Sequence, residues 1–578
     1  MKVKSKNRFM SAIIAMVLAL SLIFAGCSKN EDVTKKTDTS VEKKDEEKNT
    51  VEDKVEDNKV ETPTWVSDEN LNPLGELPLC KEKVTLKVLI AQSANVDDYE
   101  ENSFTKKIEE YGNVDLQFEV VPGTDYSTKL NLMMNSGTDL PDIIISGLSA
   151  TTVSKYGAEG MLIPLNEYYE NSSYYIKNAL KREELKDKNL LSYITAPDGN
   201  IYTVLNYNET LQNEFTHVLW IYKPWLDELG LDVPETLEEY KNALQAFKDN
   251  DMNHNGEADE IPFLDYTNDN ASSGVHAILN TFLTFEHYMD MLSVKDGTLR
   301  YAFTTDEWKQ GMKYVADLCK NGLISTATFT IDQAQWKAIL ADEVNKVGSF
   351  VNTSPSCLPA GSTRRSEFVP VVLKGENNCA SRIYRPSLPT YSFAITKDCE
   401  NPEVAFRVGD LLCSDELTIW SNWGEKGVDW VEPGPDDHAS YEFLGYKATI
   451  KPILSAGSAH SAHWGVALGI RTYDVAAGVV SATDVTRTVK AEAVGMLIDY
   501  IPDETVGTLI YADNEAEEYG EIFTDAKLYY REMTTKFITG FEDIDASWDN
   551  YINELENNIN LNRALEIAQN AYNRTHGK

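Results

Sequence analysis

Basic residues are scarce in this chain. It has 53 lysines and arginines against 92 aspartates and glutamates, which gives a formal net charge of −39. So acidic a surface repels phosphate backbones, and the composition therefore argues against nucleic acid as a partner. Hydrophobic residues make up 42% of the 578 positions, which is enough for two lobes that each have a core of their own.

Catalytic motifs are also absent. The sequence has no HExxH metal motif, no GxSxG nucleophile motif, no GKS phosphate loop and no GxGxxG dinucleotide motif. Carboxylates are so numerous that no pair can be assigned to glycoside hydrolysis. These absences agree with a binding protein better than with an enzyme.

The N-terminus predicts a secretion signal over residues 1–26. Basic residues precede an apolar run, residues 12–25, that is too short to span a membrane. The run ends in Phe-Ala-Gly-Cys27, which resembles the lipobox of bacterial lipoproteins and implies that Cys27 is lipidated. The alternative is an ordinary cleaved signal peptide in which Cys27 has no role. Several acyl chains on Cys27 would anchor the protein stably to the outer face of the cell membrane.

The segment from Cys27 to residue 78 is expected to be a disordered, charged tether. Residues 28–64 contain no aromatic side chain and no core-forming pattern. The six cysteines beyond Cys27 lack zinc-type spacing and predict no particular disulfide. Folded structure is expected to begin near Leu79.

The most distinctive stretch is DMNHNGEADEIP at residues 251–262. Side chains with oxygen atoms stand at positions one, three, five and nine, and glycine stands at six, which is the spacing of an EF-hand calcium loop. Pro262 occupies position twelve, where glutamate is usual, and Glu260 is the carboxylate left to replace it. The alternative is a turn without metal, because Asn, Asp and Gly favour turns.

Strand and helix patterns alternate after the tether. Their order predicts an open α/β sheet, in which ligands bind beyond the carboxyl ends of the strands. The loops at those ends are residues 91–95 and 146–149. The expected strands are residues 84–90, 114–121 and 140–146, and the expected helices are residues 104–111 and 127–136.

Short phrases stand in a specific order along residues 82–430. They are LPDII at 140–144, GMLIPLN at 160–166, DGxxY at 198–202, WLxxLGL at 225–231, NGxxDEIP at 255–262, YxxxLxxxGLI at 314–324 and NPExA at 401–405. Each phrase is weak alone, but the series resembles the extracellular solute-binding proteins of family 1, the oligosaccharide-capturing lipoproteins of ABC importers.

The resemblance implies a periplasmic-binding-protein-like type II fold, with two α/β lobes, a hinge and a central ligand cleft. The expected lobe 1 is residues 79–205 plus 386–430, and the expected lobe 2 is residues 206–385 plus 431–578. The chain is expected to cross between the lobes near residues 205–211, 385–391 and 429–436.

The resemblance also implies that the loop in lobe 2, residues 251–262, binds calcium as a structural ion. Family members that carry this Asx-rich loop bind calcium there. The implied ligands are Asp251, Asn253, Asn255, Glu257 through its carbonyl, Asp259 and Glu260.

Sugar capture needs aromatic faces for the C–H side of the ring and polar groups for the hydroxyls. Trp423 lies in a segment, residues 421–430, that resembles the Tyr-Gly-x-Glu-Gly segment near the family's cleft, with Trp in place of Tyr. The alternative for each aromatic is a place in a lobe core. The predicted ligand-binding residues are Trp220, Trp423, Trp464, Tyr391, Tyr202, Asn206 and Asn352.

Together these features predict a membrane-anchored, extracytoplasmic protein that captures an oligosaccharide and delivers it to the permease subunits of an ABC transporter. We expect a monomer without enzymatic activity. The alternatives are a ligand-presenting sensor subunit and an anchored glycan-active enzyme. The net charge disfavours a strongly anionic ligand, unless arginines make a local exception; the candidates are Arg364, Arg365, Arg382 and Arg385.

Overall fold

A computed structural model describes residues 67–94, 96–266, 273–359, 361–453, 463–480 and 485–577. All of them belong to one compact unit, Trp65–Lys578. The predicted signal peptide, Cys27 and the tether up to residue 66 lie outside the described residues. In the part of the chain that is described, no helix has the length and apolar character needed to cross a membrane.

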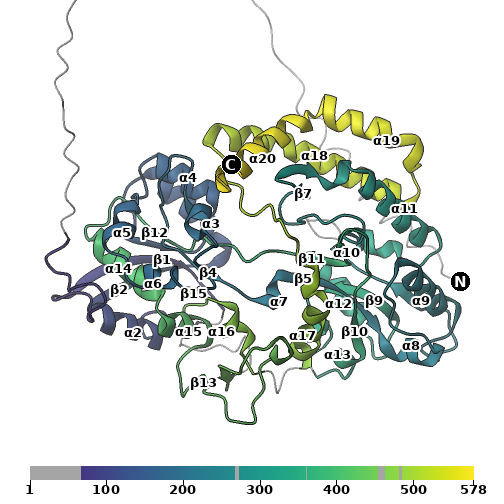
Figure 1. Cartoon of the computed structure of the whole chain (residues 1–578), viewed down its shortest axis with the longest axis horizontal. Coiled ribbons are helices and arrows are strands. Elements are labelled where there is room, and N and C mark those ends of the chain that lie inside the picture. The colour runs from purple at the N-terminus through teal and green to yellow at the C-terminus, as the bar shows by residue number, and fades with distance from the viewer. Residues whose placement is uncertain are drawn as a thin grey trace, which may run out of the picture. The chain divides into compact units, whose positions relative to one another are not determined.

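Lobe 1 is built on a four-stranded sheet with the order β12-β3-β1-β2. Strand β1 pairs in parallel with β2 and β3, whereas β12 returns antiparallel to β3. Helices surround this sheet (Figure 1). The elements are β1 (Val84–Ala91), α2 (Ser103–Gly112), β2 (Val114–Val121), α3 (Gly123–Ser136), β3 (Ile143–Ile145), α4 (Ala150–Ala158), α5 (Asn166–Asn171), α6 (Tyr175–Ala179), η1 (Leu190–Ile194), β12 (Phe393–Ile395), α14 (Pro402–Leu412) and α15 (Asp415–Trp423).

The inner strands of lobe 1 carry apolar runs, Ile-Ile-Ile in β3 and Val-Leu-Ile near the end of β1, because both faces of the sheet are buried there. The edge strand β2 alternates apolar and polar residues. Side chains alternate between the faces of a strand. Val88 and Ile90 join one core cluster, and Leu89 between them joins the other. Ile144 is likewise separated from its neighbours Ile143 and Ile145. The predicted strands and helices of this lobe are confirmed, with ends that differ by a few residues.

Lobe 2 contains a mixed sheet with the order β10-β5-β9-β6, and β11 also pairs with β5. Trp220 and Leu219, neighbours on β5, face different core clusters, so this sheet is also covered on both faces. The elements are β5 (Phe215–Tyr222), α8 (Lys223–Leu229), α9 (Leu237–Asp249), β6 (Ile261–Phe263), α10 (Ser273–Leu279), β7 (Leu292–Lys295), β8 (Thr298–Tyr301), α11 (Asp306–Lys320), α12 (Gln333–Leu340), β9 (Val347–Asn352), α13 (Arg364–Glu367), β10 (Phe368–Val371), β11 (Arg382–Tyr384) and α17 (Val485–Leu497).

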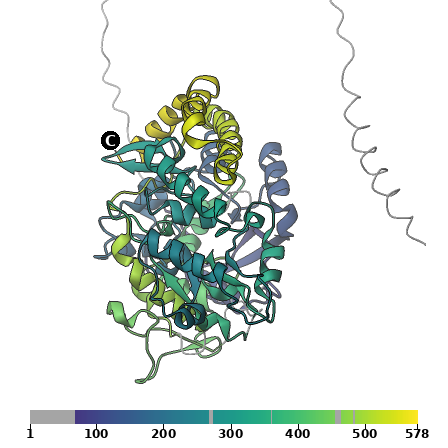
Figure 2. The same cartoon turned by 90° about the vertical axis from the view of Figure 1, so that its right-hand side faces the viewer.

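The last helices form a layer over lobe 2. Helix α18 (Asp513–Thr539) contacts α11 and α20 (Leu561–Thr575), and α20 contacts β8. With α19 (Ile544–Asn553) they form the yellow layer at the top of both views (Figures 1 and 2). Helix α18 also contacts α4, so this layer touches lobe 1 as well.

Three of the crossings between the lobe cores lie side by side. The first crossing runs from Tyr207 in the core of lobe 1 to Leu211 in the core of lobe 2, through β4 (Tyr207–Asn208) and α7 (Leu211–Glu214). The second crossing runs back from Tyr384 to Phe393. Both lie close to where they were expected.

The third of these crossings is at β15 (Ile470–Arg471) and α16 (Tyr473–Ala477). The chain already reaches the lobe 2 core at Tyr441, just beyond the crossing expected at residues 429–436. After α15 the chain forms a short ribbon of β13 (Trp430–Val431) and β14 (Lys451–Pro452). It then returns to lobe 1, where Trp464 and Leu468 are core residues, before it crosses. The apolar side chains that place residues 463–470 in lobe 1 have no periodicity that distinguishes one lobe from the other.

Lobe 1 also begins earlier than expected. We define residues 67–82 as the N-terminal strap. Leu71 and Leu79 are 6% and 5% exposed and belong to the lobe 1 core. The Ser67 hydroxyl donates to Glu403 Oε1 at 2.7 Å, and Arg407 Nη1 donates to the Asn72 carbonyl at 2.7 Å. The expected tether therefore ends before the strap, at or before residue 66.

Candidate ligand-binding site at the lobe crossings

The three crossings lie side by side. β15 pairs in parallel with β4, so that Ile470 is beside Tyr207 and Arg471 is beside Asn208. The Asn206 side-chain amide donates to Thr390 Oγ1 at 2.9 Å, to Ser392 Oγ at 3.0 Å and to the Ala467 carbonyl at 3.0 Å. Asn206 thus links all three segments and is 4% exposed.

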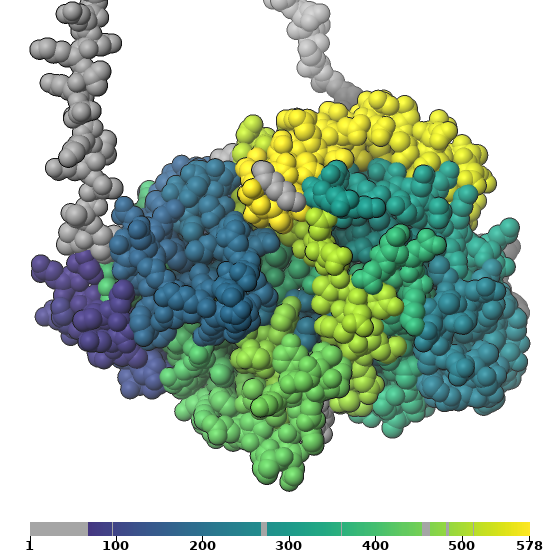
Figure 3. Space-filling view, in the orientation of Figure 1, coloured from purple at the N-terminus to yellow at the C-terminus, as the bar shows by residue number. Residues whose placement is uncertain are grey.

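The surface is hollowed between the lobes at these crossings. In the space-filling view the hollow lies at α7, between lobe 1 and the yellow-green chain of α17 and the residues after it (Figure 3). A hollow between two α/β lobes, floored by their crossings, is where this architecture binds ligands.

Lobe 1 brings a strained turn to the carboxyl end of β3. Ser146 and Gly147 have φ values of +69° and +72°, in the left-handed region. The Tyr126 hydroxyl donates to the carbonyls of Ile145 and Ser146 at 3.0 and 3.2 Å, which holds the turn in place. A Cβ on Gly147 would lie 2.3 Å from the Tyr126 ring, so this position requires glycine. The turn then leads to Ser149, the N-cap of α4. The loop expected at residues 146–149 thus has a strained, left-handed backbone, a feature that is common in ligand-binding loops.

Two buried glutamates hold the crossings together. Glu209 is 1% exposed and accepts hydrogen bonds from the Tyr207 hydroxyl at 2.8 Å and from the Tyr473 amide at 3.1 Å. Its carboxylate also pairs with Lys188. Its charge is therefore balanced within the site.

Glu214 is 2% exposed and joins the second and third crossings. Its carboxylate accepts from the amide of Ser387 at 3.0 Å and from the hydroxyl of Tyr473. Burial raises the pKa of Glu214 above its usual value. Neither glutamate was predicted, because the sequence around them shows only that a crossing begins there.

Arg471 is a further residue that the sequence did not reveal. Its guanidinium carbon lies 5.1 Å from the centre of the Trp423 ring, and its Nε donates to the Glu209 carbonyl at 3.3 Å. Nη1 and Nη2 donate to Asn422 Oδ1 and Thr210 Oγ1. Trp423, at the end of α15, is half-buried and thus lies beside the third crossing.

Two other predicted binding residues are also close to the crossings. Tyr391 is on the second crossing, is half-buried, and donates its hydroxyl to the Tyr193 carbonyl at 2.6 Å. Asn206 is described above. The structure thus brings together Trp423, Tyr391 and Asn206, with Asn208 as a neighbour whose amide donates to Asn206 Oδ1 at 2.8 Å.

The remaining predicted binding residues lie in the lobe interiors or on β9. Trp220 is 0% exposed and donates its indole N–H to the Asn352 carbonyl at 2.9 Å. Trp464 is 1% exposed and packs against Phe104 at 5.1 Å between ring centres. Tyr202 is 3% exposed and donates to Asp198 Oδ2 at 2.6 Å. These three rings have no free face for a sugar, because the two-sided sheets need large side chains in their cores. Asn352 is part of the β5–β9 pairing, and its amide donates to the Ser354 carbonyl.

The Asx-rich loop forms a closed turn in lobe 2. Asp251 accepts hydrogen bonds from the amides of Asn255 and Gly256 at 3.1 and 2.9 Å. The Asn253 and Asn255 carboxamides lie 2.7 and 3.0 Å from Asp259 Oδ1, and their hydrogen bonds help to lower the pKa of Asp259. Asn253 and Asn255 thus lie beside Asp259, and Asp251 closes the same turn; carboxylate and carboxamide groups of this kind supply the oxygen ligands that a hard cation such as calcium prefers.

Two of the implied ligands are less well placed. The Glu260 carboxylate accepts from the Met252 amide at 2.8 Å, at the base of the loop. Glu257 donates its amide to Asn255 Oδ1 at 2.7 Å. Lys346 pairs with Asp259 at 3.0 Å. Over the described ranges, no group of three or more His, Cys, Asp or Glu residues could hold a metal ion, so the loop would depend on its two asparagines.

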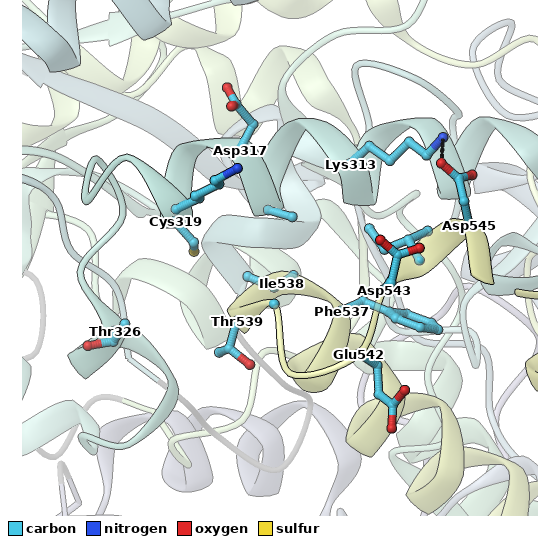
Figure 4. Close-up of a pocket in the computed structure, with 14 residues that line it drawn as sticks. Lys313, Asp317, Cys319, Thr326, Phe537, Ile538, Thr539, Glu542, Asp543 and Asp545 are labelled. Atoms are coloured by element: carbon cyan, nitrogen blue, oxygen red, sulfur yellow. Dashed lines mark ion pairs between the residues drawn. The ribbon is translucent and has the colours of Figure 1, made fainter. Parts of the chain in front are cut away.

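A separate pocket of about 720 Å³ lies between α11 and the turn from α18 to α19 (Figure 4). Two of its charged residues are already paired, since Lys313 binds Asp545 at 2.6 Å. Phe537, its aromatic residue, is 2% exposed and offers no ring face. This pocket therefore suits a sugar less well than the crossings do.

The fold and the crossings define the chain as a periplasmic-binding-protein-like protein of type II, with two α/β lobes joined by a hinge. A family model for the bacterial extracellular solute-binding proteins matches residues 94–417, and the chain belongs to this family. The family, as its name states, is one of binding proteins.

Similar proteins agree with this assignment. The chain is 27% identical over 359 residues to the fructooligosaccharide ABC transporter substrate-binding protein FusA of Streptococcus pneumoniae. That alignment covers 60% of this chain and 64% of the length of the Streptococcus protein. Among solved structures, a human-milk-oligosaccharide (HMO) binding solute-binding protein associated with an ABC transporter of Bifidobacterium longum infantis has a TM-score of 0.72 at 18% identity, covering 85% of this chain and 99% of that one. FusA in complex with kestose has a TM-score of 0.66 at 22% identity, with coverages of 85% and 99%.

Proposed function

We propose that this protein captures an oligosaccharide outside the cell and delivers it to the permease of an ABC transporter. The observation that carries the proposal is the match over 359 residues to a relative named as a fructooligosaccharide substrate-binding protein. Family membership and the fold of the neighbouring structures support the same function.

The chemistry of the crossings supports a sugar ligand. A pyranose or furanose ring presents hydroxyls to amides and arginines, and C–H groups to aromatic rings. Trp423 and Tyr391 supply half-buried rings, and Asn206 and Arg471 supply polar groups. Closure of the two lobes about the crossings would bury the ligand, and the closed form would dock on the permease.

The anchor and the ion are parts of the same proposal. Lipidated Cys27 would hold the protein, as a monomer, on the outer face of the membrane, and the tether would let the lobes reach the permease. Calcium would be held by Asp251, Asn253, Asn255 and Asp259, with Glu257 and Glu260 completing the predicted set, and would stabilise lobe 2.

The test is a calorimetric titration of the purified protein with a panel of oligosaccharides, followed by chromatography of the recovered ligand. We expect micromolar or tighter binding of at least one glycan and its recovery intact. Release of shorter products would instead favour the glycan-active enzyme. Failure of every glycan, with binding of a peptide or lipid, would contradict the proposal. A sensor role would appear as ligand-dependent capture of a receptor in place of a permease.

A further inference from the structure

Arg471 carries a charge that no acidic side chain balances. Its three hydrogen-bond acceptors are the Glu209 carbonyl, Asn422 Oδ1 and Thr210 Oγ1, all of which are neutral. No carboxylate of the described residues forms an ion pair with it, although the protein has an excess of acidic residues. The guanidinium has five N–H groups, so two remain available for a ligand.

Burial makes this arrangement costly. Desolvation lowers the pKa of Arg471 to about 10, and no nearby anion opposes that effect. A structural cross-link between crossings could be made by a neutral amide at lower cost. An arginine in this position is better explained if the bound ligand supplies an anionic group that pairs with the guanidinium.

A second arginine, which is exposed where Arg471 is partly buried, also lies against an aromatic ring. The guanidinium carbon of Arg385, on the second crossing, lies 5.2 Å from the centre of the Tyr288 ring. Arg385 is exposed, and it too has no ion-pair partner over the described ranges. Its backbone amide donates to the Glu214 carbonyl at 2.7 Å.

Glu214 connects the two arginines. Its backbone carbonyl accepts from the Arg385 amide. Its carboxylate accepts from the hydroxyl of Tyr473, which stands two residues after Arg471. Neither nearby acid forms an ion pair with these arginines. The Glu209 carboxylate pairs with Lys188, and the Glu214 carboxylate accepts from the Ser387 amide and the Tyr473 hydroxyl.

We propose that the ligand of this site is an acidic oligosaccharide, one that carries uronic-acid carboxylates, and that Arg471 and Arg385 bind those carboxylates. The inference rests on the proposed function and specifies its substrate class. Arginine pairs with carboxylate through two parallel hydrogen bonds, a geometry that a neutral sugar hydroxyl cannot reproduce. The aromatic rings beside both arginines hold the guanidinium planes in place and add a surface for the sugar ring.

The experiment compares two trisaccharides that share one backbone, trigalacturonate and its fully methyl-esterified form, in which neutral methyl esters replace the carboxylates. We expect the acid to bind about tenfold more tightly or better, since a charge-assisted hydrogen bond contributes that much, and we expect added salt to weaken its binding. Arg471→Met and Arg385→Met should each reduce the preference for the acid. Because Arg471→Met removes cross-links and can impair folding, Arg471→Lys and the exposed Arg385→Met serve as the second tests.

Arg365→Met is the control, since Arg365 donates to the carbonyls of Leu358 and Ser356 in lobe 2 and should leave the preference unchanged. Equal or tighter binding of the ester, or of a neutral fructan trisaccharide, would overturn the acidic-ligand proposal and leave the proposed function intact. Failure of the acidic, esterified and neutral oligosaccharides alike would overturn both.

Discussion

His276 and His287 face each other inside lobe 2 with their Nδ1 atoms 2.7 Å apart. The two side chains are 1% and 7% exposed. One ring must donate the single proton between the two nitrogens and the other must accept it, so at least one of the two imidazoles must be neutral. Burial lowers the pKa of His287 to about 4 and that of His276 well below its usual value.

This pair predicts a loss of stability in mild acid. A histidine whose pKa is lowered by folding stabilises the protein fully above its unfolded pKa, and that stability is lost as the pH falls through this value towards the folded pKa. With an unfolded pKa of about 6.5 and a folded value of about 4, His287 alone should cost about 2 kcal/mol at about pH 5. The melting temperature should therefore fall between about pH 7.5 and about pH 5.

The variant His287→Gln keeps a hydrogen-bonding side chain and removes the titration, so its melting temperature should depend less on pH. His438→Gln is the control, since His438 is exposed and pairs with Glu442 on the surface. An identical pH dependence in wild type and His287→Gln would show that the pair does not set acid stability.

Substitution of two tryptophans that were predicted to bind ligand should have different effects on stability and on ligand affinity. Trp464 is a core residue whose indole N–H donates to Thr105 Oγ1 at 2.7 Å, so Trp464→Ala should cost about 3–5 kcal/mol of unfolding free energy. The milder Trp464→Phe should leave ligand affinity unchanged. Trp423→Ala should weaken ligand binding about tenfold with a small change in stability.

Denaturant unfolding and calorimetric titration of the same samples measure both quantities. The result that contradicts this assignment is the reverse, with affinity lost in Trp464→Phe and retained in Trp423→Ala.

The N-terminal strap should depend on a buried ion pair. Arg407 and Glu403 are paired at 2.9 Å with side chains 7% exposed, and both bind strap residues. Arg407→Met leaves Glu403 buried without its partner, which should cost about 3–5 kcal/mol. It should also speed trypsin cleavage at Lys81 and Lys83. Glu183→Gln, which removes an exposed pair with Lys186, should cost no more than about 1 kcal/mol. Unchanged cleavage in Arg407→Met would show that the strap is held by other contacts.

Calcium removal should lower stability more than affinity. An ion that binds only the folded protein stabilises it by about 2.7 kcal/mol when its concentration is a hundred times its Kd. The melting temperature of wild type should therefore fall after chelation and recover with added calcium, whereas Asp251→Asn should respond to neither treatment. Asp232→Asn, a change at an exposed position outside the loop, should respond as wild type does. A wild-type melting temperature that is indifferent to chelator would count against a metal in this loop.

Much of the fold could be predicted because local patterns determine it. The inner strands of lobe 1, β1 and β3, are recognisable because a sheet buried on both faces needs apolar runs. The capping box of Thr236 and Glu239 marks the start of α9.

The parts that could not be predicted depend on contacts between distant residues. The strap is held by Glu403 and Arg407, which lie more than 330 positions later in the chain. Arg471 becomes a site residue only because β15 pairs with β4. The sequence predicts ligand contact for both Trp464 and Trp423, and only the packing of lobe 1 shows that Trp464 is a core residue.

The most direct test of the central claim is a crystal structure of the protein with a bound oligosaccharide. The account predicts the sugar in the hollow between the lobes, in contact with Trp423, Arg471 and the crossing around Asn206. A sugar bound instead in the pocket between α11 and the α18–α19 turn, with the hollow left free, would contradict it.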